Sequence, residues 1–109
     1  MSIQHLMVHV SCSSIEETEK ITDALIASRL AACVNRIGPI QSSYEWQGTR
    51  CQDEEYLLLI KTRESKLEAV ISKVKEIHSY KVSEIIAVPI VGGSQDYLNW
   101  VTVQTRETN

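Results

Sequence analysis

The chain has 109 residues, of which 43% are hydrophobic and 23% are charged, and its formal net charge at pH 7 is -3. This size and composition predict one globular domain over residues 1–109 with a core of its own. An acidic balance without a lysine or arginine cluster argues against a nucleic-acid partner. No apolar run is long enough to cross a bilayer, so no membrane partner is expected either.

The number and spacing of the cysteines indicate whether the protein occupies a reducing or an oxidising cellular compartment. Cys12, Cys33 and Cys51 are odd in number and widely spaced, and no CxxC pair occurs. Such spacing fits reduced thiols better than a disulfide framework. The first residues also lack the charged and apolar regions of a secretory signal. We therefore expect a cytoplasmic protein.

The N-terminal part predicts a strand followed by a helix. Residues 5–11 alternate between two faces, one of them apolar, which is typical of a strand with one face on a core. Ser14 and Glu17 then have the spacing of a capping box. Apolar side chains recur at helical spacing after it, so a helix is expected from Ile15 to Leu30.

Residues 33–61 predict one long β-hairpin that turns at residues 47–50. Its first arm, Cys33 to Trp46, would extend about 45 Å at roughly 3.3 Å per residue, whereas a domain of this length has a radius of gyration of about 13 Å. The hairpin must therefore bend or project beyond its own core. Gly38-Pro39 predicts a bulge or kink within the first arm.

The residue types of this hairpin indicate assembly. Residues 56–60 form a continuous apolar run, which predicts a strand buried on both faces. Helices from one small subunit usually cover only one face, so a second copy of the chain is the expected cover. Aromatic residues favour subunit contacts, and the predicted interface residues are Tyr44, Trp46, Tyr56 and Trp100. The acidic stretch 53–55 is expected to be solvated or to pair with Arg50 or Lys61, with a hard-cation site as the lesser alternative.

The C-terminal part predicts a second helix and a last strand. Ser65 and Glu68 repeat the capping-box spacing, and apolar periodicity continues to Ile77. Residues 85–91 form the last core strand, followed by a Gly-Gly turn. The closing segment 97–101 is either helical or an edge piece, and a polar, frayed tail is expected from Thr105 onward.

The order of these elements defines the fold class. The pattern β-α-β-β-α-β with right-handed crossovers gives a four-stranded antiparallel sheet with both helices on one face. We therefore predict an α+β fold, a ferredoxin-like βαββαβ sandwich with a long central β-hairpin and a short closing C-terminal segment. Many functions use this architecture, so the function must come from particular residues.

Five further motifs follow one another along the chain, at residues 30–35 (LAACVN), 44–48 (YEWQG), 53–63 (DEEYLLLIKTR), 78–86 (HSYKVSEII) and 97–100 (YLNW). In sequence and order, from the first strand to about Val101, the chain resembles the CutA divalent-cation tolerance family. The resemblance implies a ferredoxin-like subunit in a tight homotrimer whose hairpins join neighbouring sheets. It also implies a link to copper and divalent-cation tolerance.

The resemblance further implies that Cys12, His78 and Glu84 bind the metal ion, which would be copper or another divalent ion such as zinc, weakly held. Each residue also has an ordinary structural interpretation: a small buried hydrophobe for Cys12, an imidazole at a helix C-terminus for His78, and a solvated carboxylate for Glu84. Family prolines after the histidine and before the glutamate are Ser79 and Ser83 in this chain.

Two functions follow from these observations, and neither is enzymatic, because no nucleophile has a base and an orienting partner at motif spacing. The first is a trimeric cytoplasmic protein that binds divalent or copper ions and takes part in metal-ion tolerance. The alternative is a non-catalytic trimeric signalling or scaffold protein, with a small anionic metabolite or a protein partner in the clefts between subunits. Arg29, Arg36 and Lys81 are the scattered candidates for a basic pocket of that kind.

Overall fold

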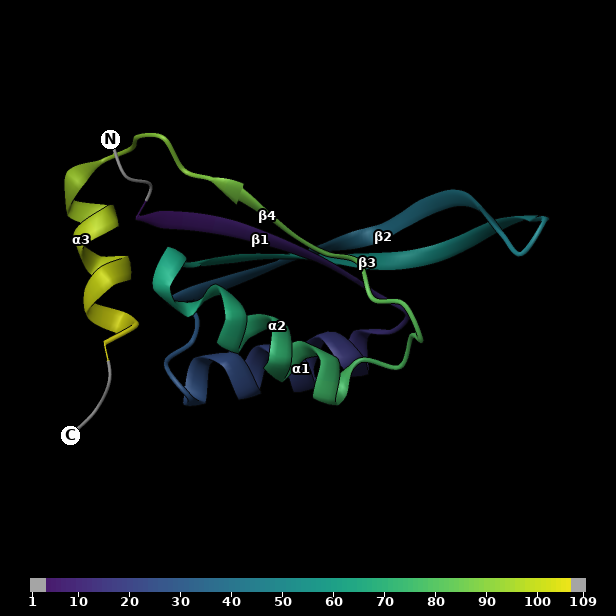
Figure 1. The fold of residues 1–109 in the computed structure, drawn as a ribbon, viewed down its shortest axis with the longest axis horizontal. Coiled ribbons are helices and arrows are strands. Elements are labelled where there is room, and N and C mark those ends of the chain that lie inside the picture. Colours follow the sequence, from purple (N-terminus) through teal and green to yellow (C-terminus); the bar gives the residue numbers. More distant parts are fainter. Residues whose placement is uncertain (1–3, 107–109) are drawn as a thin grey trace.

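A computed structural model describes residues 4–106. Its elements follow the predicted order and end in an additional helix (Figure 1). They are β1 (His5–Cys12), α1 (Ile15–Ala27), β2 (Cys33–Trp46), β3 (Thr49–Arg63), the 3-10 turn η1 (Glu64–Lys66), α2 (Leu67–Ile77), β4 (Ile85–Pro89) and α3 (Gln95–Gln104).

The four strands form one antiparallel sheet in the order β2-β3-β1-β4. Helices α1 and α2 lie side by side against one face of this sheet, and α3 lies at the end opposite the hairpin tip (Figure 1). The predicted α+β class and the ferredoxin-like arrangement are confirmed. No helix within residues 4–106 combines the length and apolar character needed to cross a bilayer.

The core lies between the sheet and the two helices. Every second residue of β1 from Leu6 to Cys12 is buried, as the predicted alternation requires. Ile21 and Leu25, one helical turn apart on α1, meet this face. The buried cluster comprises Val8, Val10, Cys12, Ile21, Leu25, Ala31, Leu58, Ile60, Val70 and Val74.

The long hairpin is present and projects beyond the helices (Figure 1). The described chain measures 45 × 29 × 22 Å along its principal axes. Gln47 and Gly48 form the turn with φ angles of 51° and 82°, a two-residue turn of the kind that fits twisted strands. The register of β2 against β3 shifts between Ile37 and Ile40, which confirms the bulge expected at Gly38-Pro39.

The sheet face away from α1 and α2 is only partly covered. In the register, His9 pairs with Leu59 on one side and with Ile86 on the other, so all three side chains belong to this face. Leu59 is half-buried, whereas Ile86 and its neighbour Val88 are exposed. Within one chain, residues 56–60 are therefore fully buried on one face only, and the predicted cover of the other face by a second copy stays a prediction.

Several predicted boundaries also differ. Helix α1 ends at Ala27 rather than Leu30, because Arg29 adopts the left-handed conformation (φ 58°) that commonly terminates helices. Ser65 does not cap α2, because it lies within the 3-10 turn that leads into the helix. Strand β4 ends at Pro89, two residues before the predicted Val91.

The closing segment is helical, and the tail expected from Thr105 onward is not free at its start. Thr105 is fully buried, and the Arg63 guanidinium donates to its hydroxyl and to its carbonyl oxygen, each at 2.8 Å. These bonds attach the end of α3 to the end of β3. Residues 107–109 of the predicted tail lie outside the described residues.

We expect Thr105→Val to lower the free energy of unfolding by about 1–2 kcal/mol, because the isosteric side chain leaves a charged donor of Arg63 without its hydroxyl acceptor. Urea denaturation of the two proteins at equal concentration measures the difference. Thr49→Val, at an exposed strand position, serves as the control and should change stability by no more than about 0.5 kcal/mol. Equal effects of the two substitutions would contradict the role assigned to Thr105.

Candidate metal centre

Three elements bring a sulfur, a nitrogen and an oxygen donor together. Cys12 ends β1, Glu17 lies in the first turn of α1, and His78 directly follows α2. One donor atom from each side chain lies within 4.8 Å of the other two. The side chains of His78 and Glu17 are 0% and 9% exposed, and Cys12 is fully buried. The three side chains therefore form a polar cluster that is shielded from solvent at one end of the core.

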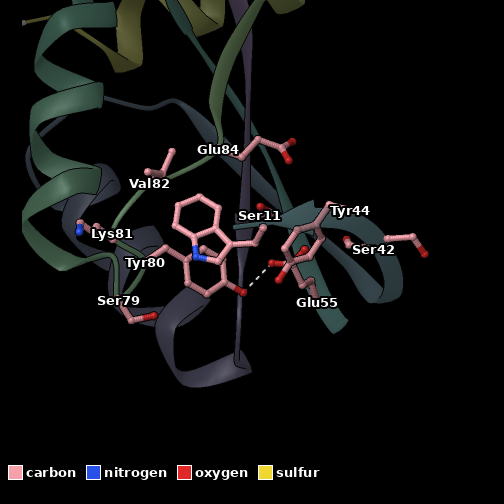
Figure 2. A pocket seen from close by; sticks show the side chains of 11 residues that line it. Ser11, Ser42, Tyr44, Glu55, Ser79, Tyr80, Lys81, Val82 and Glu84 are labelled. Atoms are coloured by element: carbon pink, nitrogen blue, oxygen red, sulfur yellow. Dashed lines mark hydrogen bonds between the residues drawn. The ribbon is translucent and has the colours of Figure 1, made fainter. Parts of the chain in front are cut away.

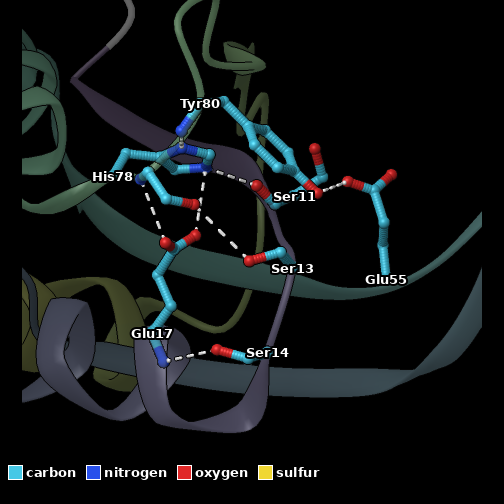
Figure 3. Close-up of polar contacts among 8 residues, drawn as sticks. Ser11, Ser13, Ser14, Glu17, Glu55, His78 and Tyr80 are labelled. Carbon is cyan, nitrogen blue, oxygen red and sulfur yellow. Dashed lines mark hydrogen bonds and ion pairs between the residues drawn. The ribbon is translucent and has the colours of Figure 1, made fainter.

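The His78 ring is held by backbone groups on both nitrogens (Figure 3). The backbone N–H of Tyr80 donates to Nδ1 at 3.1 Å, and Nε2 lies 2.6 Å from the carbonyl oxygen of Ser11. Since Nδ1 accepts, the proton of the neutral ring is assigned to Nε2, which donates to Ser11. The imidazole thus contacts β1 rather than the C-terminus of α2. A metal ion at Nε2 would have to replace this proton and its hydrogen bond.

Glu17 has one satisfied and one unsatisfied carboxylate oxygen. Oε2 accepts from the backbone N–H of Ser79 at 3.0 Å, whereas Oε1 is buried without a hydrogen-bond partner, 3.6 Å from His78 Nε2. A buried acceptor without a partner is costly. A cation placed between Glu17, His78 and Cys12 would satisfy it, so the donor set fits a metal ion.

Of the two hydrogen bonds in the predicted capping box, the structure contains the one made by the Ser14 hydroxyl and lacks the one made by the Glu17 carboxylate. The Ser14 hydroxyl accepts from the backbone N–H of Glu17 at 3.2 Å, as expected for an N-cap. The Glu17 carboxylate, however, bonds the backbone N–H of Ser79. Ser79 occupies a position where the resemblance has proline, and proline has no N–H to donate. The serine therefore supplies a bond that holds Glu17 toward the cluster.

The thiol of Cys12 is protonated in the metal-free protein. Burial raises its pKa to about 12, and the negative charges of Glu17 and Glu55 act in the same direction. Cys12 also belongs to the apolar core cluster, so its structural interpretation as a small buried hydrophobe describes the metal-free chain. Metal binding here must release a proton, because the thiolate is the ligand.

Glu84 does not belong to this group of donors. Its side chain is exposed just before β4 and lines a neighbouring cavity. The structure thus brings together two of the three predicted ligands, Cys12 and His78, and Glu17 supplies the carboxylate. A sequence signal for Glu17 did exist: it precedes Ile21 and Leu25 by one and two helical turns, so it is a carboxylate on the apolar face of α1.

The neighbouring cavity, of about 660 Å³, lies between the hairpin and the loop that precedes β4 (Figure 2). Two predicted interface residues, Tyr44 and Trp46, line it. Trp100 stacks obliquely near Tyr97 on α3 with ring centroids 5.7 Å apart, and Tyr56 is half-buried on β3.

The charges around this cavity do not suit an anionic metabolite. Lys81 is its one basic lining residue, against Glu55 and Glu84. Arg36, another candidate for a basic pocket, lies 3.9 Å from Glu19 instead. This cavity therefore does not supply the basic pocket of the alternative function, whose predicted place between subunits stays a prediction.

Comparison with known proteins places these features in a family. The family model described as CutA1 divalent ion tolerance protein matches residues 6–104. The chain is 42% identical over 105 residues to the chloroplastic protein CutA of Arabidopsis thaliana, covering 96% of this chain and 58% of that relative. It is 40% identical over 99 residues to the divalent-cation tolerance protein CutA of Thermus thermophilus, covering 91% and 96%.

Solved structures agree with the sequence matches. CutA1 from Oryza sativa superimposes with a TM-score of 0.93 at 42% identity and 98% coverage of both chains. The periplasmic divalent cation tolerance protein CutA from Archaeoglobus fulgidus gives 0.91 at 35% identity, covering 94% of this chain and 99% of that one. On the sequence match over residues 6–104 and this structural agreement, the chain belongs to the CutA1 divalent ion tolerance family.

Proposed function

We propose that this protein binds copper or another divalent ion such as zinc at Cys12, Glu17 and His78, and that it takes part in divalent-cation tolerance through this site. The observation that carries the proposal is the convergence of a thiol, an imidazole and a carboxylate within 4.8 Å of one another, with Oε1 of Glu17 buried beside the other two donors. The relatives named for divalent-cation tolerance support the role. Binding is non-catalytic, with the ion as cargo.

The donor set suits a borderline or soft ion. Thiolate, imidazole and carboxylate are common zinc ligands, and thiolate and imidazole also favour copper. Donor atoms around a tetrahedral zinc ion lie roughly 3.5 Å apart, so donors within 4.8 Å of one another need only a small approach. Uptake must displace the Cys12 proton and a hydrogen bond of His78. These costs make the ion weakly held, and binding weakens as pH falls.

The proposal includes a homotrimer, as the resemblance implies. Two features support assembly: the projecting hairpin, and exposed apolar residues such as Ile86 and Val88 on the sheet face away from α1 and α2. Such side chains are suited to contact another chain. We also propose a cytoplasmic location, because the three cysteines are free and a reducing compartment would keep them so.

A competition titration tests the metal site. The reduced, chelator-stripped full chain is titrated with Zn²⁺, and separately with Cu⁺, against a chromophoric chelator, while native mass spectrometry records the mass of the assembly. We expect about one ion per chain, and at least a tenfold loss of affinity in Cys12→Ser and in Glu17→Gln. The Gln variant retains an acceptor for the Ser79 N–H, which protects folding.

Cys51→Ser provides the matched control, because Cys51 lies near the hairpin tip and outside the cluster. It should bind as tightly as the unmodified chain. Absence of uptake, or equal uptake by the Cys12, Glu17 and Cys51 variants, would show that the cluster is only a buried polar network. A monomeric mass would remove the trimer from the proposal and leave the metal site standing.

A further inference from the structure

The loop of residues 79–84, which leads from His78 to β4, is attached to the metal cluster at its first two residues (Figure 3). The backbone N–H of Ser79 donates to Oε2 of Glu17 at 3.0 Å, and the backbone N–H of Tyr80 donates to Nδ1 of His78 at 3.1 Å. Glu17 and His78 are two of the three proposed ligands. The position of the loop therefore depends on which hydrogen bonds these two side chains can accept.

The side chain of Tyr80 attaches the same loop to the sheet. Its ring lies edge-on to the His78 ring, with centroids 4.7 Å apart. Its hydroxyl donates to Oε2 of Glu55 on β3 at 2.5 Å (Figure 2). Glu55 is only 6% exposed, and a hydrogen bond to a carboxylate is stronger than one between neutral groups. All of these contacts lie within one chain, so none of them relies on a side chain being exposed.

The two ligands must respond differently to an ion. Glu17 can coordinate through Oε1, which has no hydrogen-bond partner, and still accept from Ser79 at Oε2. His78 faces Glu17 with Nε2, 3.6 Å from Oε1, so the ion must bind at Nε2. A neutral imidazole that coordinates through one nitrogen carries its proton on the other, which then acts as a donor.

This requirement conflicts with the metal-free geometry at Nδ1 of His78. Once Nδ1 carries the proton, it would face the backbone N–H of Tyr80 across 3.1 Å, with two donors opposed and no acceptor between them. A buried donor without an acceptor is costly. The ring is fixed by the ion, so the backbone of Tyr80 must move.

We propose, as a property that rests on the proposed metal site, that the loop 79–84 has two positions and that the ion selects between them through the tautomer of His78. On uptake the ring stays neutral, because Nε2 releases its proton to solvent and Nδ1 takes one up from solvent. The backbone of Tyr80 then leaves Nδ1, and its hydroxyl leaves Glu55, while Ser79 keeps its bond to the carboxylate ligand. Occupancy of a buried site thereby becomes a change at the sheet face beside the hairpin.

NMR of the reduced, chelator-stripped full chain in its assembled form tests the two positions, with ring-labelled histidine and with Zn²⁺ as a diamagnetic probe. Without zinc, His78 should show the Nε2–H tautomer, and with zinc the Nδ1–H tautomer. The Tyr80 amide should exchange with solvent about tenfold faster or more in the zinc-bound protein. The Ser79 amide, which stays on Glu17, should change by no more than about twofold and so serves as the internal control.

Tyr80→Phe removes the hydroxyl bond that favours the metal-free position and retains the ring. Zinc should therefore bind to this variant about three- to tenfold more tightly than to the unmodified chain, as measured by competition with the chelator. A purely structural role of the bond would leave the affinity unchanged or lower it. Tyr44→Phe is the matched control, because the Tyr44 hydroxyl donates to another carboxylate of β3, that of Asp53, outside the cluster. Its zinc affinity should stay within about twofold.

Three results would each overturn the two positions of the loop: a metal-free His78 with its proton on Nδ1, a Tyr80 amide that exchanges equally fast with and without zinc, or a Tyr80→Phe variant that binds zinc no more tightly than Tyr44→Phe. Absence of zinc uptake by the unmodified chain would overturn the metal site as well. Uptake with an unmoved loop would leave the metal site standing and remove only the coupling.

Discussion

Replacing Gly38 by alanine is expected to lower the free energy of unfolding by about 2–4 kcal/mol, by combining backbone strain with overpacking. Gly38 lies in the bulge of β2 with φ 151°, a conformation that L side chains rarely adopt. A Cβ atom there would lie 2.7 Å from Cδ1 of Tyr56 and 3.1 Å from the carbonyl oxygen of Glu55. The tyrosine ring can rotate away, but the backbone of β3 cannot.

Urea denaturation at one protein concentration measures this effect, because association between chains would add to the apparent stability. Gly92→Ala is the control. It adds the same methyl group at a backbone that needs no positive φ, and no atom beyond the residue itself and its two chain neighbours lies within 4 Å of the new Cβ. It should change stability by no more than about 0.5 kcal/mol. If Gly38→Ala proved as mild as Gly92→Ala, the bulge would have to be more adaptable than its geometry indicates.

The sequence predicts the elements of this fold well because each one has a local cause. Alternation in β1, helical spacing in α1 and α2, and the glycine in the turn at Gln47-Gly48 all act over a few residues. The wrong prediction for the C-terminal tail has a different cause, which is a contact between segments distant in the sequence. Thr105 looks like the start of a frayed tail until Arg63, 42 residues away in sequence, bonds to it.

The residues of the candidate sites also differ in whether the sequence or a contact between distant segments identifies them. Cys12 and His78 could be named from a resemblance, whereas the sequence marked Glu17 only as a carboxylate on the apolar face of α1. The backbone N–H of Ser79, from another element, holds that carboxylate toward the cluster. Strand alternation assigns Glu55 to the open sheet face with Leu57 and Leu59. Only the loop that carries Tyr80 over that face buries the carboxylate. Contacts between distant segments therefore decide which polar residues become sites.

The buried thiol of Cys12 predicts an alkaline loss of stability. Its pKa rises from 9.0 to about 12 on folding, mainly because burial disfavours the thiolate. A group whose pKa is higher in the folded state stabilises the fold fully below its unfolded pKa, and this contribution is lost as pH rises from about 9 to about 12. Between pH 8 and pH 10, the loss is on the order of 1 kcal/mol.

The measurement is urea denaturation at pH 8 and pH 10 with chelator and reductant present, for the unmodified chain, Cys12→Ala and Cys51→Ala. Tyr80 has a pKa raised by burial and by its bond to Glu55, and so adds a loss of the same sign at still higher pH. The difference between variants isolates the thiol. Cys12→Ala is less stable at pH 8, because a core atom is lost, but its stability should change with pH by roughly 1 kcal/mol less. Cys51→Ala should retain the full change. An unaltered pH dependence in Cys12→Ala would mean that water reaches the thiol, in which case a thiolate could form there without a metal to displace its proton.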